Sequence, residues 1–231
     1  MAQLDLWEKE YEERKDLPSS QTMVPSRALR EFWESEEIKN LHMDSALDIG
    51  SGLGRNSIYM AAQNGFAHVV GVEIVDSAVD KARETIDELG LQNKITFVNQ
   101  SVGDSLPFED QSFDLIVDMM VMHLLDPNER AKYFAEIQRL LKPNGFFVFY
   151  TIAADSEAAK ALFESSPGPE ENSYIIPQSR MIEKAFTDDE LIKAFPELNV
   201  IRLNHKTQLT PAFGDVYKRE YISGVMKKPL A

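Results

Sequence analysis

Two hydrophobic periods alternate in the middle of the chain, between residues 45 and 150. Short apolar runs there have the length and the β-branched or aromatic content of buried strands. Between most of them, apolar residues recur at the spacing of one helix face. Strands that alternate with helices in this way predict a parallel sheet covered on both faces. The expected strands are 46–49, 68–72, 95–98, 113–118 and 146–150, and the expected helices are 55–64, 77–89 and 127–141.

The two ends of the chain have other patterns. Residues 5–16 and 26–40 predict amphipathic N-terminal helices, and the first carries Trp7 and Tyr11 at i, i+4 spacing. Capping boxes, each an N-cap residue followed three positions later by Glu, open the helix after Asp126 and a short helix after Thr187. Two further strands are expected near the C-terminus, at 198–207 and 215–226.

Charge and composition narrow the classes of partner. Among the 231 residues, 38 are Asp or Glu and 24 are Lys or Arg, which gives a net charge of −14. Such a surface repels phosphate backbones and anionic lipids, so we expect neither a nucleic-acid nor a membrane partner. The charged N-terminus has no apolar signal segment, which predicts a cytoplasmic location. Because cysteine is absent, disulfides, thiolate nucleophiles and cysteine metal sites are excluded.

A glycine-rich turn carries the strongest chemical signal. Gly50, Gly52 and Gly54 directly follow the first expected strand, and a helix begins next to them at Arg55. Without Cβ atoms, the backbone can turn sharply and lie against a ligand, and the helix start offers free N–H groups. We therefore expect this turn, with Ser51 and Arg55, to bind a cofactor.

An acidic residue supports the same site. Glu73 ends the second expected strand, about 20 residues after the turn, where it can accept both hydroxyls of a ribose. Together, the glycine turn and Glu73 predict an adenosine-type cofactor, and Ile74, next to Glu73, is expected to contact it. The alternative is that Glu73 only caps the helix that follows.

The chemistry of the turn distinguishes two cofactor classes. A dinucleotide site needs G-x-G-x-x-G, but the last glycine position holds Arg55 or Ser57, depending on where the count begins. The carboxylate of Asp48 also opposes a pyrophosphate, because like charges would lie side by side. The same carboxylate suits a ligand with an ammonium and a sulfonium group. The residues therefore favour S-adenosylmethionine.

Residues 46–152 resemble the class I S-adenosylmethionine-dependent methyltransferases, in particular small-molecule enzymes with a methyltransferase 11-type core. The resemblance implies a doubly wound α/β fold, a Rossmann-like, mostly parallel sheet of seven strands in the order 3-2-1-4-5-7-6. It also implies methyl transfer to a small-molecule acceptor. The matching motifs are Leu47-Asp48-Ile49-Gly50-Ser51-Gly52-Leu53-Gly54, Glu73, Leu106-Pro107-Phe108 with Ser112-Phe113-Asp114-Leu115-Ile116, and Leu140-Leu141-Lys142-Pro143-Asn144-Gly145.

One motif departs from the family. The family commonly has Gly-Asp-Ala before the Leu-Pro-Phe run, and its Asp reaches the adenine amino group. Here Ser101 and Val102 stand at that place, and Asp104 follows too late. We expect backbone groups of Ser101 and Val102 to meet the adenine, with Asp104 as the alternative if the loop is shortened.

Two residues after the fourth strand are candidates for catalysis. Methyl transfer is an in-line displacement that depends largely on positioning. Asp118 is expected to face the methyl group or the cofactor, unless it caps a helix. His123 is a candidate general base, and its alternative role is that of a packed core histidine. No histidine spacing indicates a metal site.

The predicted organisation is a single domain over residues 1–231. Because residues 153–186 are long for a connection, a lid or substrate loop is expected there. The alternatives to a methyltransferase are a nicotinamide-dependent oxidoreductase, a non-catalytic domain that binds S-adenosylmethionine, and an aminopropyl transferase. The predicted segments are an N-terminal helical cap (1–40), the cofactor-binding core (44–152), the lid or substrate loop (153–186), and the C-terminal helix and strands (187–231).

Overall fold

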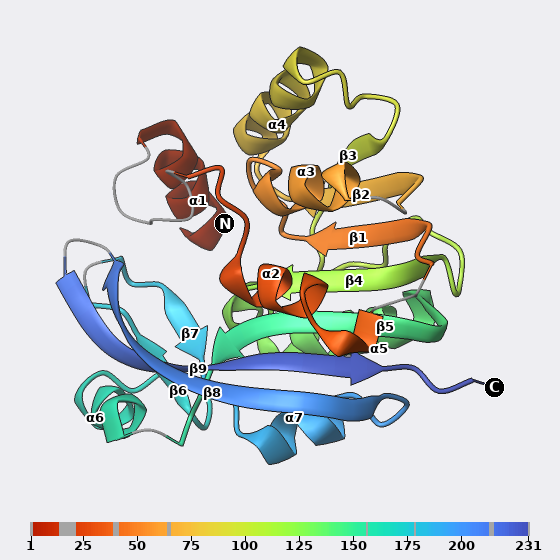
Figure 1. The fold of residues 1–231 in the computed structure, drawn as a ribbon. Coiled ribbons are helices and arrows are strands. Elements are labelled where there is room, and N and C mark those ends of the chain that lie inside the picture. The colour runs from red at the N-terminus through yellow and green to blue at the C-terminus, as the bar shows by residue number, and fades with distance from the viewer. Residues whose placement is uncertain are drawn as a thin grey trace.

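The fold centres on a seven-stranded sheet in the order β3-β2-β1-β4-β5-β9-β8 (Figure 1). Strands β1 to β5 are parallel, and β9 is antiparallel to β5 and to β8. The expected fold class and strand order are confirmed. The strands are β1 (Ser45–Ile49), β2 (His68–Glu73), β3 (Ile95–Asn99), β4 (Phe113–Met119), β5 (Leu141–Ile152), β8 (Asn199–Ala212) and β9 (Asp215–Lys227). This computed structural model describes residues 2–13, 22–38, 42–63, 66–155, 157–177, 179–212 and 215–230.

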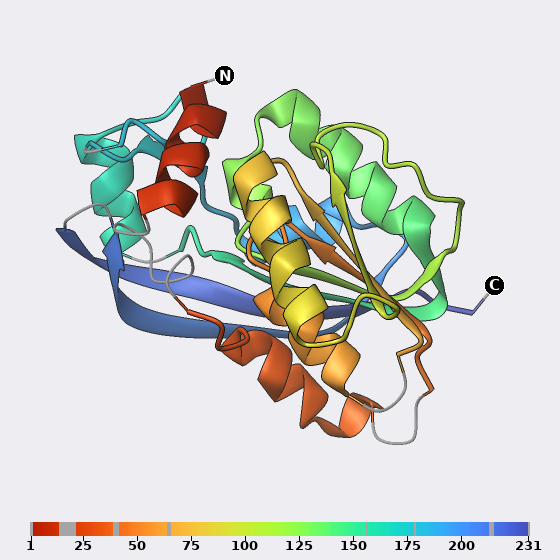
Figure 2. The same cartoon turned by 90° about the horizontal axis from the view of Figure 1, so that it is seen from above.

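Helices cover both faces of the sheet (Figure 2). Buried side chains of α2, α3 and α4 pack on one face, and those of α5 and α7 pack on the other. The strands between the two layers are apolar on both sides, as a parallel sheet requires. The bounds are α2 (Arg27–Trp33), α3 (Arg55–Ala62), α4 (Asp76–Glu88), α5 (Pro127–Leu140) and α7 (Asp188–Ala194).

From residue 45 onward, the helix starts predicted at 55, at 127 and after Thr187 are right, and the start predicted at 77 differs by one residue. The capping boxes at Asp126 and Thr187 are both formed. The helix expected to start after Ser77 instead begins at Asp76. The carboxylate of Glu73 accepts the N–H groups of Ile74 and Val75 just ahead of it, so the turn into α4 is built without the Ser77 side chain. The helix expected over residues 26–40 is interrupted. Helix α2 ends at Trp33, and a short helix, η2 (Glu36–Ile38), follows.

The segment 153–186, expected to be a loop, contains a helix and a small sheet. They are α6 (Glu157–Ser165) and the antiparallel strands β6 (Ser173–Ile175) and β7 (Ile182–Lys184). Strand β7 lies beside η3 (Met122–Leu124), the short helix after β4. We call α6, β6, β7 and the adjoining part of the β8–β9 hairpin the C-terminal arm.

The N-terminal helix α1 (Ala2–Glu13) lies beyond the ends of β1 and β4, opposite the C-terminal arm (Figure 1). Its Trp7 packs against two separate apolar clusters. One contains Leu53 and Val75, beside the glycine turn, and the other contains Tyr174 and Tyr221, in the C-terminal arm. Helix α1 therefore bridges the cofactor half and the C-terminal half of the molecule.

Candidate functional site

A cavity of about 610 Å³ lies at the carboxyl ends of the parallel strands. Its size is that of a small-molecule site, for which about 300–1,000 Å³ is usual. In open α/β sheets, ligands bind at this edge. The predicted site residues that line it are Gly50, Ser51, Gly52, Arg55, Glu73, Ile74, Ser101, Val102 and His123.

The glycine turn has the backbone shape that requires glycine. Gly52 and Gly54 have φ angles of +53° and +81°, in the left-handed region. A Cβ on Gly52 would lie 2.6 Å from the Tyr11 hydroxyl, and one on Gly54 would lie 2.7 Å from the Phe97 ring. Gly52 therefore leaves room at the cavity wall. Gly54 does not line the cavity and instead allows α3 to start close to β3.

Two buried polar atoms at the turn, one in Asp48 and one in Ser51, lack a hydrogen-bond partner among the described residues. Asp48 is 1% exposed, and its Oδ2 accepts a hydrogen bond of 2.6 Å from Ser57. Its Oδ1 and the hydroxyl of Ser51 have no hydrogen-bond partner there. Burial raises the pKa of Asp48 to about 7, although the Ser57 hydroxyl acts against that shift. Because unpaired buried polar atoms are costly, this turn fits a ligand that brings a polar or cationic group.

Glu73 joins the turn to the next strand. Its Oε2 accepts the N–H of Gly52 at 2.9 Å, and its Oε1 accepts those of Ile74 and Val75 at 2.9 and 3.0 Å. Burial raises its pKa above the ordinary value, and these three N–H groups oppose the rise. Glu73 thus lines the cavity and also caps the segment before α4, so both sequence interpretations describe part of its surroundings.

Arg55 and Tyr11 enclose the cofactor half of the cavity. The Arg55 guanidinium donates to the carbonyl of Val24 at 2.9 Å and to the hydroxyl of Ser26 at 3.1 Å. It therefore ties the segment before α2 to the turn. Tyr11 reaches the turn from α1, and burial, aided by the charge of Glu73, raises the pKa of its hydroxyl, which stays protonated.

The loop after β3 forms the part of the cavity wall where the family resemblance implies that the adenine binds. Ser101 and Val102 line the cavity, whereas Asp104 is exposed and does not. The Ser101 hydroxyl accepts the N–H of Gly103 at 3.2 Å, which shapes the loop. The alternative contact through Asp104 is therefore disfavoured by its position.

Asp118 has the geometry of a turn cap. It is fully buried, and its Oδ1 accepts the N–H of Val121 at 2.7 Å. Its Oδ2 accepts the N–H of Met122 at 3.0 Å and the hydroxyl of Tyr133 at 2.6 Å. Asp118 does not line the cavity. The structure therefore favours the capping alternative over the catalytic one.

His123 does line the cavity. Its Nε2 lies 3.7 Å from Oε1 of Glu183, and its Nδ1 is buried with no hydrogen-bond partner among the described residues. The cavity also brings in residues that the sequence did not indicate, and one of them, Glu183, is the residue near His123. These are Met181, Glu183, Gln208, Arg219 and Tyr221, all in the C-terminal third of the chain and all lining the cavity.

The sequence contains a weak signal for only one of these residues, Arg219. Side chains alternate along a strand, so Arg219, Tyr221 and Val225 share one side of β9, and an arginine in line with buried apolar residues is unusual. Glu183 has no such signal, because its three-residue strand lies in the segment expected to be a loop.

Other site types are not formed by the part of the chain that the structure describes. In those ranges, no group of three or more His, Asp or Glu side chains is placed to hold a metal ion. Within the same residues, no helix has the length and apolarity needed to cross a bilayer.

Comparison with known proteins identifies the central segment. Residues 46–145 match the family model described as a methyltransferase domain. A sarcosine/dimethylglycine N-methyltransferase from Aphanothece halophytica is 33% identical over 116 residues, which cover 49% of this chain and 40% of that protein. The chain spans only 35–45% of the length of the curated relatives that are 33–35% identical to it.

Solved structures extend the similarity to most of the chain. A methyltransferase from Methanosarcina mazei, described as S-adenosylmethionine-dependent, has a TM-score of 0.69 and 25% identity, and the match covers 83% of this chain and 95% of that one. A Burkholderia thailandensis 1,6-didemethyltoxoflavin-N1-methyltransferase with bound S-adenosylhomocysteine shares the fold, with a TM-score of 0.70, 20% identity, and coverage of 99% and 88%. The cofactor expected from the glycine turn and Glu73 is the cofactor of this family. With this match and the seven-stranded order of the sheet, the central segment of the chain is a methyltransferase domain, and the chain as a whole is similar to the S-adenosylmethionine-dependent methyltransferases.

Proposed function

We propose that this protein transfers a methyl group from S-adenosylmethionine to a small-molecule acceptor. The observation that carries the proposal is one continuous cavity that is lined by the glycine turn, by Glu73 and by His123. When bound, the cofactor supplies an electrophilic methyl carbon on a positively charged sulfur. The residues of the chain then have to hold the two reactants in line and keep water out.

The cofactor half of the cavity offers matching partners for each part of that nucleoside. Glu73 is placed to accept the ribose hydroxyls. Asp48 lies behind the glycine turn, where its charge favours an ammonium group, and the unpaired Ser51 hydroxyl adds a polar contact. Ser101 and Val102 provide the wall for the adenine.

Helix α1 closes the cavity from above. Trp7 and Tyr11 line it, and Trp7 packs against apolar residues on both of its sides. A site covered in this way takes a compact acceptor more readily than a folded macromolecule. The net charge of −14 also opposes polyanionic acceptors.

His123 is the general base in this proposal. It lines the cavity beyond the turn, and its unpaired Nδ1 can receive a proton from an acceptor. Asp118 holds the turn that carries His123 and takes no part in the proton transfer.

Calorimetric titration and a turnover assay test this proposal. S-adenosylhomocysteine should bind the wild-type protein at micromolar or lower concentration, and NADH should not. Release of S-adenosylhomocysteine from S-adenosylmethionine should then follow addition of phenols, heteroaromatic N–H compounds, thiols, amines or carboxylic acids. Binding without turnover on any of them would support the non-catalytic alternative, and NADH binding alone would contradict the cofactor assignment.

A further inference from the structure

We propose that Glu183 is a positioning residue that holds His123 as the base, and that the cavity thereby selects an uncharged acceptor with a removable proton, such as a phenol or a heteroaromatic N–H compound. This inference rests on the proposed methyl transfer and deepens it, because it names the residue that orients the base and the class of acceptor.

The first support is the burial of the pair. The side chains of His123 and Glu183 come from η3 and β7, and the two residues are only 3% and 4% exposed. The His123 Nε2 lies 3.7 Å from the Glu183 Oε1, which is ion-pair distance and slightly beyond a hydrogen bond. Catalytic hydrogen bonds are often long before substrate binds and shorten in the complex. A carboxylate buried against an imidazole in a ligand cavity is costly, so it needs a functional reason.

The second support is the way Glu183 itself is held. The Tyr174 hydroxyl donates to its Oε2, and Nη1 of Arg219 lies 3.2 Å from the same oxygen. The Arg219 guanidinium also lies over the Tyr174 ring, 5.9 Å from its centre. Burial alone would raise the pKa of Glu183, but His123, Arg219 and Tyr174 together hold it below its usual value. Glu183 therefore remains a carboxylate at neutral pH, in a fixed position.

The third support is the free nitrogen of His123. A carboxylate beside Nε2 favours the tautomer that carries its proton on Nε2, and this leaves a lone pair on Nδ1. Within the described residues, Nδ1 is buried and has no hydrogen-bond partner. An acceptor that reaches this atom and donates an X–H group would satisfy it.

The charges around His123 indicate an acceptor without charged groups. Asp118 acts on His123 from β4, and Glu183 and Arg219 form an ion pair on its other side. Two more distant cations, Arg130 and Lys184, are paired with Glu170 and Glu190. A carboxylate acceptor would meet only these cations, which are already paired, and an ammonium acceptor has no lone pair with which to attack the methyl carbon; each would also pay a desolvation cost on entry. The titratable and charged groups on the elements around η3 include Asp118, Glu129, Arg130, Tyr133, Tyr150, Tyr174, Glu183, Lys184, Arg219 and Tyr221.

The remaining wall fits an aromatic or otherwise apolar body. Methionine, leucine and tyrosine side chains surround the position between the glycine turn and His123. Tyr150 and Tyr221 stack on each other with their ring centres 4.9 Å apart, which makes a flat apolar surface. These wall residues are Met119, Met120, Leu124, Tyr150, Met181 and Tyr221.

The step balances with the groups named. The acceptor heteroatom X forms a bond to the methyl carbon, and the carbon–sulfur bond breaks with its electron pair remaining on sulfur. The proton of X–H passes to Nδ1 of His123. The resulting imidazolium faces the Glu183 carboxylate, which stabilises the new positive charge.

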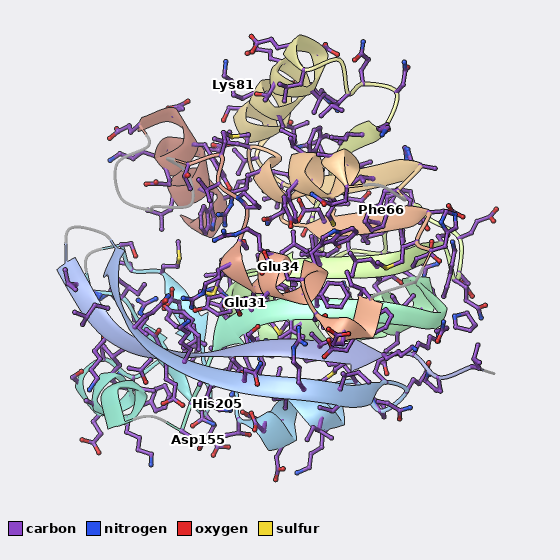
Figure 3. The ribbon with its side chains drawn as sticks, in the orientation of Figure 1. Glu31, Glu34, Phe66, Lys81, Asp155 and His205 are labelled. Atoms are coloured by element: carbon purple, nitrogen blue, oxygen red, sulfur yellow. The ribbon has the colours of Figure 1, made fainter. Side chains whose placement is uncertain are left out.

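The first test reads the histidine directly. In ¹⁵N-labelled protein with S-adenosylhomocysteine at pH 7.5, His123 should show a protonated Nε2 and an unprotonated Nδ1, with His123→Gln identifying its signals. The Glu183→Gln variant should lose this tautomer preference. His205, on the outer side of β8, provides the matched control as His205→Gln (Figure 3). A proton on Nδ1 in the wild type would overturn the inference and leave the cofactor site untouched.

The second test uses turnover of 4-substituted phenols and benzimidazoles, with sarcosine and benzoate as charged acceptors. His123→Gln should lower kcat by about 10²–10⁴-fold, the usual contribution of a general base. In that variant, the more acidic phenols should lose the least rate. Glu183→Gln should lower kcat with little change in KM and shift the pH profile, while both variants keep wild-type affinity for S-adenosylhomocysteine. The inference would be refuted if the wild-type protein preferred sarcosine or benzoate, although that result would still support methyl transfer. It would also be refuted if the Glu183→Gln variant kept the wild-type kcat and pH profile.

Discussion

Replacing Glu73 by Gln tests how the cofactor half of the site is built. Glu73 is 6% exposed, and its two oxygens accept three backbone N–H groups at 2.9–3.0 Å. An amide has only one acceptor oxygen. If that oxygen keeps the bonds to Ile74 and Val75, the new NH₂ group faces the N–H of Gly52, donor against donor. The glycine turn then loses its anchor, and the ribose loses its acceptor.

The magnitude follows from these contacts. A hydrogen bond to a charged group is worth about 1.5–3 kcal/mol, and stranding a buried donor costs about 1–3 kcal/mol. We expect S-adenosylhomocysteine to bind the Glu73→Gln protein about 10- to 100-fold more weakly, since each tenfold change corresponds to about 1.4 kcal/mol. The free energy of unfolding should also fall by about 1–3 kcal/mol.

Isothermal titration calorimetry with S-adenosylhomocysteine measures the first effect, and chemical denaturation measures the second. Glu84→Gln is the matched control, because Glu84 is an exposed carboxylate of α4 paired with Lys81, whose side chain points outward (Figure 3). It should change neither quantity appreciably. A Glu73→Gln protein that is less stable but binds with wild-type affinity would show that Glu73 only supports the fold.

Three further predictions concern neighbouring groups. Because Asp48 has a pKa of about 7, its ionised fraction grows between pH 6 and pH 8, so affinity for the ammonium-bearing S-adenosylhomocysteine should rise over that range in calorimetry and become flat in Asp48→Asn. Gly52→Ala and Gly90→Ala should each lower the free energy of unfolding by about 1–2 kcal/mol, because both glycines have positive φ angles. Only Gly52→Ala, whose new methyl group would meet Tyr11, should weaken cofactor binding. Equal losses of binding in the two variants would contradict this. Asp118→Asn should lower the melting temperature through its buried hydrogen bonds, and lost turnover without lost stability would instead indicate catalysis.

The first five strands and the turn between β1 and α3 follow from local information. Each strand is a short apolar run bounded by turn residues, and the glycines stand where the backbone needs a positive φ. The helix starts at Asp126 and Thr187 are also local, because the side chain and the N–H group that it caps are three residues apart. Such features depend on neighbours in the chain and need no knowledge of the rest of the fold.

The start of α4 and the surroundings of Asp118 were harder to predict from the sequence. Glu73 reaches both the turn at Gly52 and the residues before α4, so one side chain serves two segments. Asp118 was expected to face the reacting groups, yet Tyr133 on α5 and the backbone after β4 take up both of its oxygens. In each case the outcome depends on which donors the tertiary structure brings within reach.

The sequence alone thus determined the alternating strands and helices of the core and the cofactor turn, because hydrophobic period, glycine placement and capping act over a few residues. The strand order came from the resemblance to the methyltransferase family. Only the tertiary structure decided the acceptor side of the cavity. Glu183 comes from a strand too short to show a period, and Arg219 comes from the long C-terminal hairpin. Their approach to His123 is set by packing between segments far apart in the chain, and no local pattern records such contacts.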